Sequence, residues 1–440
     1  MLLVNFRLTG LLVLLGLFAP SIPAAEQPQP DPLSPQQIQK RILEHRTAQV
    51  TLTVTSPDGK PLANTDVVVR QTRHKFLFGC NAFAVNTINR TSAQADYQKH
   101  FAALLNFATL PFYWGSYERR EDEPNVDNRK MMAKWCAENG IRAKGHPLCW
   151  HQVQPRWLVD KDLDSVQKLQ LGRITREVEA FKGLVDTWDV VNEAVVMPNY
   201  KGEPGPIPQL CQKLGTIELI KQTFAAARAA NPKATLILND YDTSQRYEKL
   251  IKGCLDAGVS IDVIGIQSHQ HGGYWGAKRA WDVCERFAKF GKPLNFTETT
   301  IISGEIKKNI NYSGRDPDWP TTPEGEARQE REVAEFYTIL FSHPAVEAIT
   351  WWDFSDNAWL GAPAGLVRKD MTPKPAYEKL MRLVKGEWWT AEVKATTDKD
   401  GKITFRAFLG DYSLQAPTGK ATFSIQKSGT CEATAKTNAE

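Results

Sequence analysis

The pattern of apolar and polar residues changes twice along the chain. Between residues 76 and 380, short apolar runs alternate with longer stretches in which apolar residues recur every three or four positions. The first pattern is typical of buried strands and the second of amphipathic helices. The apolar runs begin at residues 76, 104, 141, 187, 235, 262, 294 and 347. Eight strand–helix repeats of this kind predict an α/β fold, a (β/α)8 TIM barrel over residues 76–385.

Helices are predicted between these runs, for example over residues 126–140, 214–231, 279–291 and 326–344. Several of them end in Gly or Asn-Pro, which are common helix stops. An open doubly wound sheet is the alternative fold. The sequence disfavours it because no glycine-rich phosphate-binding turn follows the first apolar run.

The regions on either side of the predicted barrel alternate in the manner of β-strands. Within residues 49–75, two alternating runs flank Asp58-Gly59, which is a hairpin signature. Residues 386–428 contain further Gly-Asp and Asp-Gly turns. Neither segment has enough strands to bury a face alone, so we expect them to pack together as one small flanking β module. Residues 429–440 are polar and are expected to form a disordered tail.

The N-terminus has the pattern of an export signal. Arg7 precedes an apolar run that reaches Phe18, and small residues follow as far as Ala25. We therefore predict a signal peptide over residues 1–25, with a signal anchor as the alternative, followed over residues 26–48 by a Pro-rich linker and a helix. With no other apolar run long enough to span a bilayer, the mature chain is expected to be secreted or periplasmic, without membrane contact.

Composition narrows the possible partners. The net charge is +4 over 440 residues, and no basic block is interleaved with aromatic residues, so nucleic acid is not an expected partner. The thirteen tryptophans suit core packing and stacking on sugars. Seven cysteines leave at least one unpaired, and Cys80, Cys136 and Cys149 lie in apolar contexts typical of buried thiols. A monomer is expected.

Candidate chemistry gathers at the ends of the predicted strands. In a TIM barrel, functional residues lie at the C-terminal ends of the strands. Glu193 follows the fourth strand and Glu298 the seventh, which places them on opposite sides of one mouth. Other polar and aromatic strand-end residues are His146, Asn192, Tyr241, Gln267, His269 and Trp351. Two carboxylates in such a setting are what cleavage of a glycosidic bond requires.

Competing chemistries lack their motifs. The chain has no P-loop, no G-x-S-x-G elbow and no cluster of metal ligands. His269 and His271 alternate as two ligands on a strand would, but a third ligand at suitable spacing is missing. We therefore expect neither a metal nor a cofactor.

Several motifs resemble glycoside hydrolase family 10, the endo-β-1,4-xylanase family, over roughly residues 76–380. The motifs occur in the family's order and are KGHPLCWH at 144–151, WDVVNE at 188–193, NDY at 239–241, IQSH at 266–269, FTET at 296–299 and TPKPAY at 372–377. The resemblance implies that Glu193 is the acid/base and Glu298 the nucleophile, to which His269 hydrogen-bonds. It also implies sugar-binding roles for His146, Trp150, Asn192, Trp351 and Trp359.

Three features depart from the family pattern. Pro111, Phe112 and Gly115 stand where the family usually has the Glu, Asn and Lys that bind the second donor-side sugar. Thr300 stands where an Asp usually follows the nucleophile. Bulky Trp352 stands where Gly is usual. The catalytic pair is intact, and the donor side has been rebuilt.

The resulting hypothesis is a retaining endo-glycosidase that acts on a β-1,4-linked plant polysaccharide, with xylan as the default substrate. The alternatives are a family-10-like hydrolase for a different or decorated β-glycan, and a catalytically weak carbohydrate-binding barrel. For the second donor-side sugar, one interpretation is stacking on Phe112, Tyr113 or Trp114. In the other, Tyr113, Trp114 or Glu118 replaces the missing polar contacts. Tyr312 and Trp319 are expected to contribute to one rim.

Overall fold

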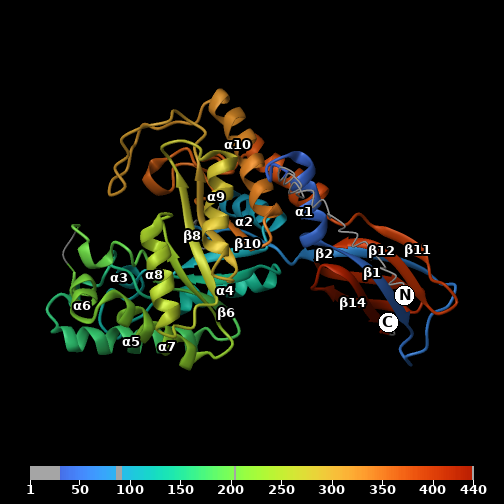
Figure 1. Ribbon diagram of the computed structural model, residues 1–440, viewed down its shortest axis with the longest axis horizontal. Helices are drawn as coiled ribbons and strands as arrows, with labels where there is room; N and C mark the ends of the chain where they lie inside the picture. Colours follow the sequence, from blue (N-terminus) through green and yellow to red (C-terminus); the bar gives the residue numbers. More distant parts are fainter. Residues whose placement is uncertain (1–29, 86–91, 203–204, 439–440) are drawn as a thin grey trace, which may run out of the picture.

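The computed structural model describes residues 30–85, 92–202 and 205–438, and it consists of a barrel and a smaller β module side by side (Figure 1). The predicted signal peptide lies outside the described residues. Within those residues, no helix has both the length and the apolar character needed to cross a membrane.

Eight parallel strands close into the barrel, in the order β10-β3-β4-β5-β6-β7-β8-β9. Their bounds are β3 Leu77–Asn81, β4 Phe107–Pro111, β5 Arg142–His146, β6 Val185–Asn192, β7 Thr235–Asp240, β8 Val263–Gln270, β9 Leu294–Ile301 and β10 Val346–Trp351. Each of the eight predicted runs forms one of them, which confirms the TIM barrel.

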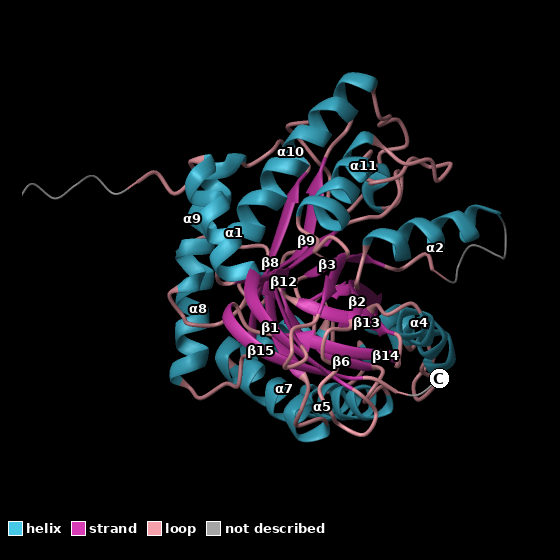
Figure 2. Ribbon diagram, turned by 90° about the vertical axis from the view of Figure 1, so that its right-hand side faces the viewer, coloured by secondary structure: helices cyan, strands magenta, loops and turns pink. Residues whose placement is uncertain are grey.

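Helices surround these strands (Figure 2). They are α2 Ser92–Leu104, α3 Trp114–Tyr117, α4 Val126–Glu138, α5 Leu163–Ala180, α6 Pro206–Leu214, α7 Thr216–Ala230, α8 Gln245–Asp256, α9 Gly276–Ala288, α10 Pro323–Ser342 and α11 Pro375–Arg382. Because the helices cover the outside and side chains fill the inside, β9 is buried along its whole length.

One glycine in β5 shows how tightly the layer between strands and helices is filled. A Cβ at Gly145 would lie 2.1 Å from the ring of Trp188, a fully buried residue of β6. Only glycine leaves room for that indole, and Gly145 directly precedes His146. Trp188 thus packs directly against the backbone of β5 below the mouth.

The β module is built from both ends of the chain, as expected. One sheet has the order β12-β1-β15 and the other β11-β2-β13-β14. The strands are β1 Thr47–Thr55, β2 Asp66–His74, β11 Val393–Thr396, β12 Lys402–Phe408, β13 Gly410–Ala416, β14 Gly419–Ile425 and β15 Gly429–Lys436. Apolar side chains from both sheets form one core between them.

Two predictions about this module are wrong. The runs that flank Asp58-Gly59 meet in one antiparallel bridge, between Thr55 and Pro61, but they do not form a two-stranded hairpin, because β1 pairs with β12 and β15 while β2 pairs with β11 and β13. A local turn does form there, after which the chain crosses to the second sheet. The expected disordered tail instead forms β15, which runs parallel to β1. Its inward side chains are as small as Cys431, Ala433 and Ala435, so the alternation is weak in the sequence.

Helix α1, Pro35–Arg46, lies between the barrel and the module (Figure 1). It packs on α10 and leads directly into β1. Arg46, its last residue, donates to the carbonyl oxygens of Phe341 and Val346, both at 2.7 Å. These bonds fix the position of the module against the barrel.

The cysteines are thiols. All seven lie in the described part of the chain and none forms a disulfide there. Cys80, Cys136 and Cys149 are buried, as predicted, and burial raises the pKa of each of these thiols.

Candidate active site

The barrel brings Glu193 and Glu298 to its mouth from different strands. Glu193 comes directly after β6, and Glu298 lies within β9. Both side chains are largely buried, with Glu193 only 9% and Glu298 only 5% exposed. Buried carboxylates are costly unless other groups stabilise them, so their surroundings are informative.

Three amide side chains connect the two carboxylates. Asn239 Nδ2 donates to Glu298 Oε1 at 3.0 Å and to Asn192 Oδ1 at 2.8 Å. Gln267 Nε2 donates to the same Asn192 oxygen at 3.1 Å and to Glu193 Oε1 at 3.2 Å. A continuous hydrogen-bonded network therefore holds both carboxylates in fixed positions.

Glu193 has an unusual backbone conformation. Its φ of 57° lies in the left-handed region, which is uncommon for a residue with a side chain. The bond from its backbone N–H to the carbonyl of Asn239, at 2.8 Å, stabilises this conformation. Strain of this kind costs about 1–3 kcal/mol and is typical of functional sites.

The pKa of Glu193 is raised to about 8, chiefly because burial disfavours the charged carboxylate. The bond that Trp150 Nε1 donates to Glu193 Oε2, at 2.9 Å, opposes this shift, while the negative charge of Glu298 adds to it. The carboxyl group of Glu193 is therefore protonated at neutral pH, which suits the acid/base role that the family resemblance implies.

Glu298 is shifted in the opposite direction. Burial alone would raise the pKa of Glu298, but His146, His269 and Lys144 outweigh it and lower that pKa below its usual value. His269 Nε2 lies 3.1 Å from Glu298 Oε2, and His146 Nε2 lies 3.9 Å from Oε1. The two carboxylates therefore differ in protonation state although they share one network.

His146 is supported by two residues that sequence reasoning missed. Its Nδ1 lies 2.7 Å from Asp189 Oδ2, which also accepts from Lys144 Nζ at 2.6 Å. All three side chains are buried. With Nδ1–H donating to the carboxylate, Nε2 is directed towards Glu298. In the sequence, the alternation of Lys144 and His146 on one strand, with Asp189 on the next, could have indicated these partners.

Thr300 holds His269 on its other side. The Thr300 hydroxyl lies 3.0 Å from His269 Nδ1 and donates to the carbonyl of Trp352 at 2.8 Å. Since its proton is used in that bond, the hydroxyl accepts from Nδ1–H. Thr300 thus orients the imidazole without adding a negative charge.

His151 is a further residue near Glu193 that was not predicted. Its Nε2 lies 3.7 Å from Glu193 Oε2, and its ring packs 4.2 Å from that of Tyr200. Burial lowers the pKa of His151 to about 4, so the imidazole is neutral. Neither ring nitrogen has a hydrogen-bond partner among the described residues.

Trp351 does not face the mouth, which corrects one predicted site residue. Its side chain is fully buried, its Nε1 donates to the carbonyl of Ala364 at 2.8 Å, and its ring lies 6.4 Å from that of Tyr337 on α10. The next residue, Trp352, faces the site instead. The Trp352 ring lies 5.5 Å from that of His146 and 6.3 Å from that of His269.

The aromatic residues after β4 are also divided between core and mouth. Phe112 is fully buried against Trp188, and Trp114 is nearly so, with its Nε1 donating to Glu118 at 2.9 Å. Glu118 is paired with Arg176 at 2.6 Å. Stacking on Phe112 or Trp114, and a polar replacement by Trp114 or Glu118, are therefore wrong.

Tyr113 alone of this group points into the mouth. Its ring lies 5.4 Å from His146, 5.5 Å from Trp150 and 5.7 Å from Phe83. Phe83 in turn lies 5.2 Å from Trp352. We call Phe83, Tyr113 and Trp352 the aromatic wall, because they line the mouth beside His146.

The remaining predicted residues lie elsewhere around the mouth. The ring of Trp359 lies 4.6 Å from His269 and 6.1 Å from Tyr312, which is 52% exposed. Tyr241 follows β7 and is 46% exposed. Trp319, by contrast, is buried and donates to the carbonyl of Glu305 at 2.8 Å, so it packs beneath the rim.

Metal ions in proteins are commonly held by His, Cys, Asp and Glu side chains. Over residues 30–85, 92–202 and 205–438, no three of them are arranged as a metal site. His269 and His271 have ring centroids 5.7 Å apart, without a third ligand.

Comparison with known proteins agrees with this geometry. The family model described as glycosyl hydrolase family 10 matches residues 69–383. A β-1,4-xylanase of Dictyoglomus thermophilum is 32% identical over 52% of this chain and 65% of its own length. The anti-sigma-I factor RsgI6 of Acetivibrio thermocellus is 25% identical over 86% of this chain and 46% of its own length. The chain thus spans less than two thirds of these curated relatives.

Solved structures show the same fold. Xylanase 10B of Thermotoga petrophila, in complex with xylobiose, is 25% identical with a TM-score of 0.60 over 71% of this chain and 95% of its own length. Together with the family model, which covers the whole barrel, this shows that the chain belongs to glycosyl hydrolase family 10, a family of glycoside hydrolases that includes these xylanases.

Proposed function

We propose that this protein hydrolyses β-1,4-linked xylan with retention of anomeric configuration. Glu298 acts as the nucleophile on the anomeric carbon, and Glu193 first protonates the leaving oxygen and then activates water. The observation that carries the proposal is the opposite pKa shift of these two carboxylates at one barrel mouth. An acid must hold its proton and a nucleophile must be ionised at the same pH.

The supporting residues fit these roles. Asn239 donates to Glu298 Oε1, and His269 Nε2 lies against Oε2, so both oxygens stay directed towards the mouth. Trp150 and Gln267 do the same for Glu193. A barrel that only binds carbohydrate has no need of a raised pKa at Glu193, and the buried charge of Glu298 would be a pure cost. The enzyme is therefore favoured over the binding protein.

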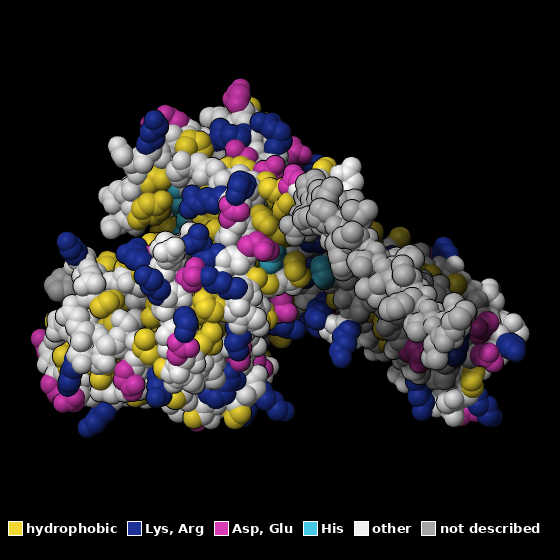
Figure 3. Space-filling view, in the orientation of Figure 1, with side chains coloured by type: hydrophobic (Ala, Val, Ile, Leu, Met, Phe, Trp, Pro, Cys, Tyr) yellow, Lys and Arg dark blue, Asp and Glu magenta, His cyan; other side chains and the backbone are white. Residues whose placement is uncertain are grey.

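The biological setting follows from the sequence. The export signal predicted over residues 1–25 supports a secreted or periplasmic location, and the xylanase relatives support a plant polysaccharide as substrate. Basic and acidic side chains are interspersed over the face drawn in Figure 3, which is consistent with the low net charge and with a partner other than nucleic acid.

The residues on the donor side favour a substituted xylan as substrate, with weak binding of the second donor-side sugar. The aromatic wall offers rings to a second donor-side sugar, with the Tyr113 hydroxyl and the Trp352 indole N–H as its polar groups, in place of the Glu, Asn and Lys usual in the family. Stacking on Tyr113 makes no hydrogen bonds to the sugar hydroxyls, so it holds a sugar more weakly and selects it less strictly than the polar set usual in the family, whose unpaired groups reject a wrong sugar. Activity on unsubstituted linear xylan is therefore low, and a substituted xylan is preferred.

A substrate panel tests this function. We expect release of xylo-oligosaccharides from glucuronoxylan and arabinoxylan, and nuclear magnetic resonance should show the β-anomer as the first product. Initial formation of the α-anomer would contradict the retaining mechanism. Rapid cleavage of unsubstituted xylo-oligosaccharides, with a strict need for a second donor-side xylose, would contradict the weak donor side.

A further inference from the structure

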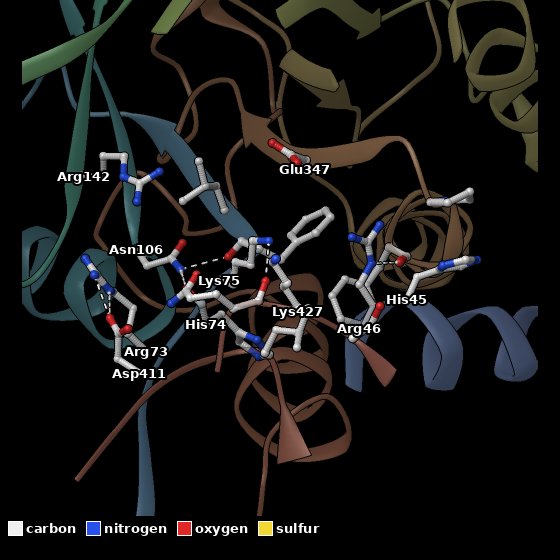
Figure 4. Close-up of a pocket in the computed structure, with 17 residues that line it drawn as sticks. His45, Arg46, Arg73, His74, Lys75, Asn106, Arg142, Glu347, Asp411 and Lys427 are labelled. Carbon is white, nitrogen blue, oxygen red and sulfur yellow. Dashed lines mark hydrogen bonds and ion pairs between the residues drawn. The ribbon is translucent and has the colours of Figure 1, made fainter. Parts of the chain in front are cut away.

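A cavity of about 450 Å³ lies where the barrel meets the β module (Figure 4). On the barrel side it is lined by residues at the N-terminal ends of strands, such as Leu77 of β3, Arg142 of β5 and Glu347 of β10. On the module side it is lined by Asp411 and by the turn between β14 and β15. Glu193 and Glu298 lie at the other end of the barrel, so this cavity is separate from the proposed active site.

The lining is strongly basic. Five cationic side chains face two carboxylates, which leaves an excess of positive charge; the cations are Arg46, Arg73, Lys75, Arg142 and Lys427, and the carboxylates are Glu347 and Asp411. They come from separate elements of the chain and converge only in the folded protein. Figure 4 shows them arranged around one space.

Part of this charge is already used by the protein. Arg73 pairs with Asp411 at 2.7 Å, and Lys75 donates to the carbonyl of Gln426 at 2.8 Å. Arg46 is occupied by backbone carbonyls of the barrel. These contacts form a fixed frame for the cavity.

The side chains of Arg142 and Lys427 remain without such partners. Neither side chain makes a hydrogen bond or an ion pair with any residue that the structure describes. Burial lowers the pKa of Arg142 and the nearby charge of Arg73 lowers it further, while the charges of Asp411 and Glu347 oppose this shift. Cations that line the same partly enclosed space repel one another, and an anion between them removes that repulsion.

We propose that this cavity binds the carboxylate groups of a uronate-bearing polysaccharide, at a second site outside the active site. Arg142 and Lys427 hold the carboxylate, and Lys75 and Arg73 contribute to the field around it. The choice of a saccharide rests on the proposed function, because a xylan with glucuronate side groups carries isolated carboxylates along a chain that also reaches the barrel.

The shape of the site fits isolated carboxylates better than a continuous polyanion. A guanidinium presents a planar fork that matches a carboxylate, and the exposed side chains of Arg142 and Lys427 are accessible to one. Glu347 and Asp411 interrupt the basic lining, so a strand of closely spaced phosphates would meet repulsion. The apolar lining residues Phe76 and Phe341 are buried and offer no ring on which a base could stack.

Substrate retention follows from this arrangement. A polysaccharide held at the module keeps its neighbouring segments close to the barrel and raises their effective concentration there. The site therefore affects hydrolysis of long acidic xylan and leaves hydrolysis of short neutral substrates unchanged.

The test uses the full chain with Glu298→Ala, so that binding is measured without turnover. Titration calorimetry compares a xylo-oligosaccharide that carries one glucuronate with the unsubstituted oligosaccharide of equal length, and with sodium sulfate. We expect the acidic oligosaccharide to bind at one additional site that the neutral oligosaccharide does not occupy. Arg142→Gln with Lys427→Gln should weaken that extra site about tenfold. Added salt should weaken it as well.

A matched variant separates this site from a general charge effect. Lys168→Gln with Lys249→Gln removes the same two charges from exposed positions on α5 and α8. Equal loss in both double variants would overturn the proposal, as would equal binding of the acidic and neutral oligosaccharides. Sulfate binding as tight as that of the acidic oligosaccharide would identify a simple anion site and overturn the saccharide assignment. Activity on a short neutral aryl xyloside, measured with Glu298 intact, reports separately on the proposed function.

Discussion

The two halves of the barrel mouth are built on different principles. On one side, β6, β7, β8 and β9 deliver Asn192, Glu193, Asn239, Gln267 and Glu298, which we call the carboxylate–amide half. Each of these side chains has a defined hydrogen-bond partner within the set. On the other side, the aromatic wall presents three rings packed edge to face.

This difference separates bond cleavage from substrate recognition. Proton transfer and nucleophilic attack need atoms fixed within fractions of an ångström, and a saturated hydrogen-bond network supplies that precision. Recognition by ring stacking tolerates variation, because a flat ring fixes the plane of a sugar but not the pattern of its hydroxyl groups. The chemistry of the family can therefore persist while the preferred glycan changes.

The largest expected effect comes from the nucleophile. Glu298→Ala removes the atom that attacks the anomeric carbon, so kcat on xylan should fall on the order of 10⁴-fold or more. Glu305→Ala, at an exposed carboxylate beyond β9, is the matched control and should leave kcat unchanged. A Glu298→Ala enzyme with near-normal kcat would remove Glu298 from the reaction.

A smaller loss is expected from the network that holds the nucleophile. Asn239→Ala removes the bonds to Glu298 Oε1 and Asn192 Oδ1 and should lower kcat roughly 10²-fold. Because the lost donor stabilised the ionised carboxylate, the pKa of Glu298 rises and the acid limb of the pH profile moves to higher pH. Asn139→Ala, at the exposed end of α4, is the control. An unmoved acid limb would show that Asn239 has only a structural role.

The aromatic wall should respond in KM rather than in kcat. Tyr113→Ala removes the ring available for stacking, and KM for substituted xylo-oligosaccharides should rise about fivefold to tenfold. Tyr113→Phe keeps the ring contacts with His146 and Trp150 and should restore KM. If the phenylalanine variant behaves like the alanine variant, the hydroxyl binds the sugar and stacking is not the basis of recognition.

The smallest effect is a shift in the alkaline limb. In the native enzyme, kcat/KM should fall as pH rises through about 8, because Glu193 then loses its proton. Trp150→Phe removes a donor that favours the ionised form, so this limb should move upward by less than about one pH unit. Trp157→Phe loses a comparable indole bond, to the carbonyl of Glu118, and should not move the limb. A downward shift for Trp150→Phe would show that the indole N–H does not stabilise the ionised carboxylate.

The sequence alone determined the barrel, the existence of a flanking β module and the convergence of Glu193 with Glu298. The spacing of the apolar residues and the lengths of the segments suffice to predict the barrel. Eight apolar runs separated by amphipathic helices have few other ways to bury their apolar surface. Convergence follows from the topology, since parallel strands all present their C-terminal ends at one mouth. Residues at those ends, such as His146 and His269, are therefore placed correctly without coordinates.

The tertiary structure decided which side each residue faces. Strands of a parallel barrel are buried on both sides. Their sequences therefore lack the alternation of apolar and polar residues that would show which side chains point into the barrel. Trp351 and Trp352 are indistinguishable by that criterion, as are Phe112 and Tyr113, and a shift of one residue exchanges core for site. Partners far apart in the chain, such as β1 with β15, meet only through tertiary strand pairing that no local pattern encodes.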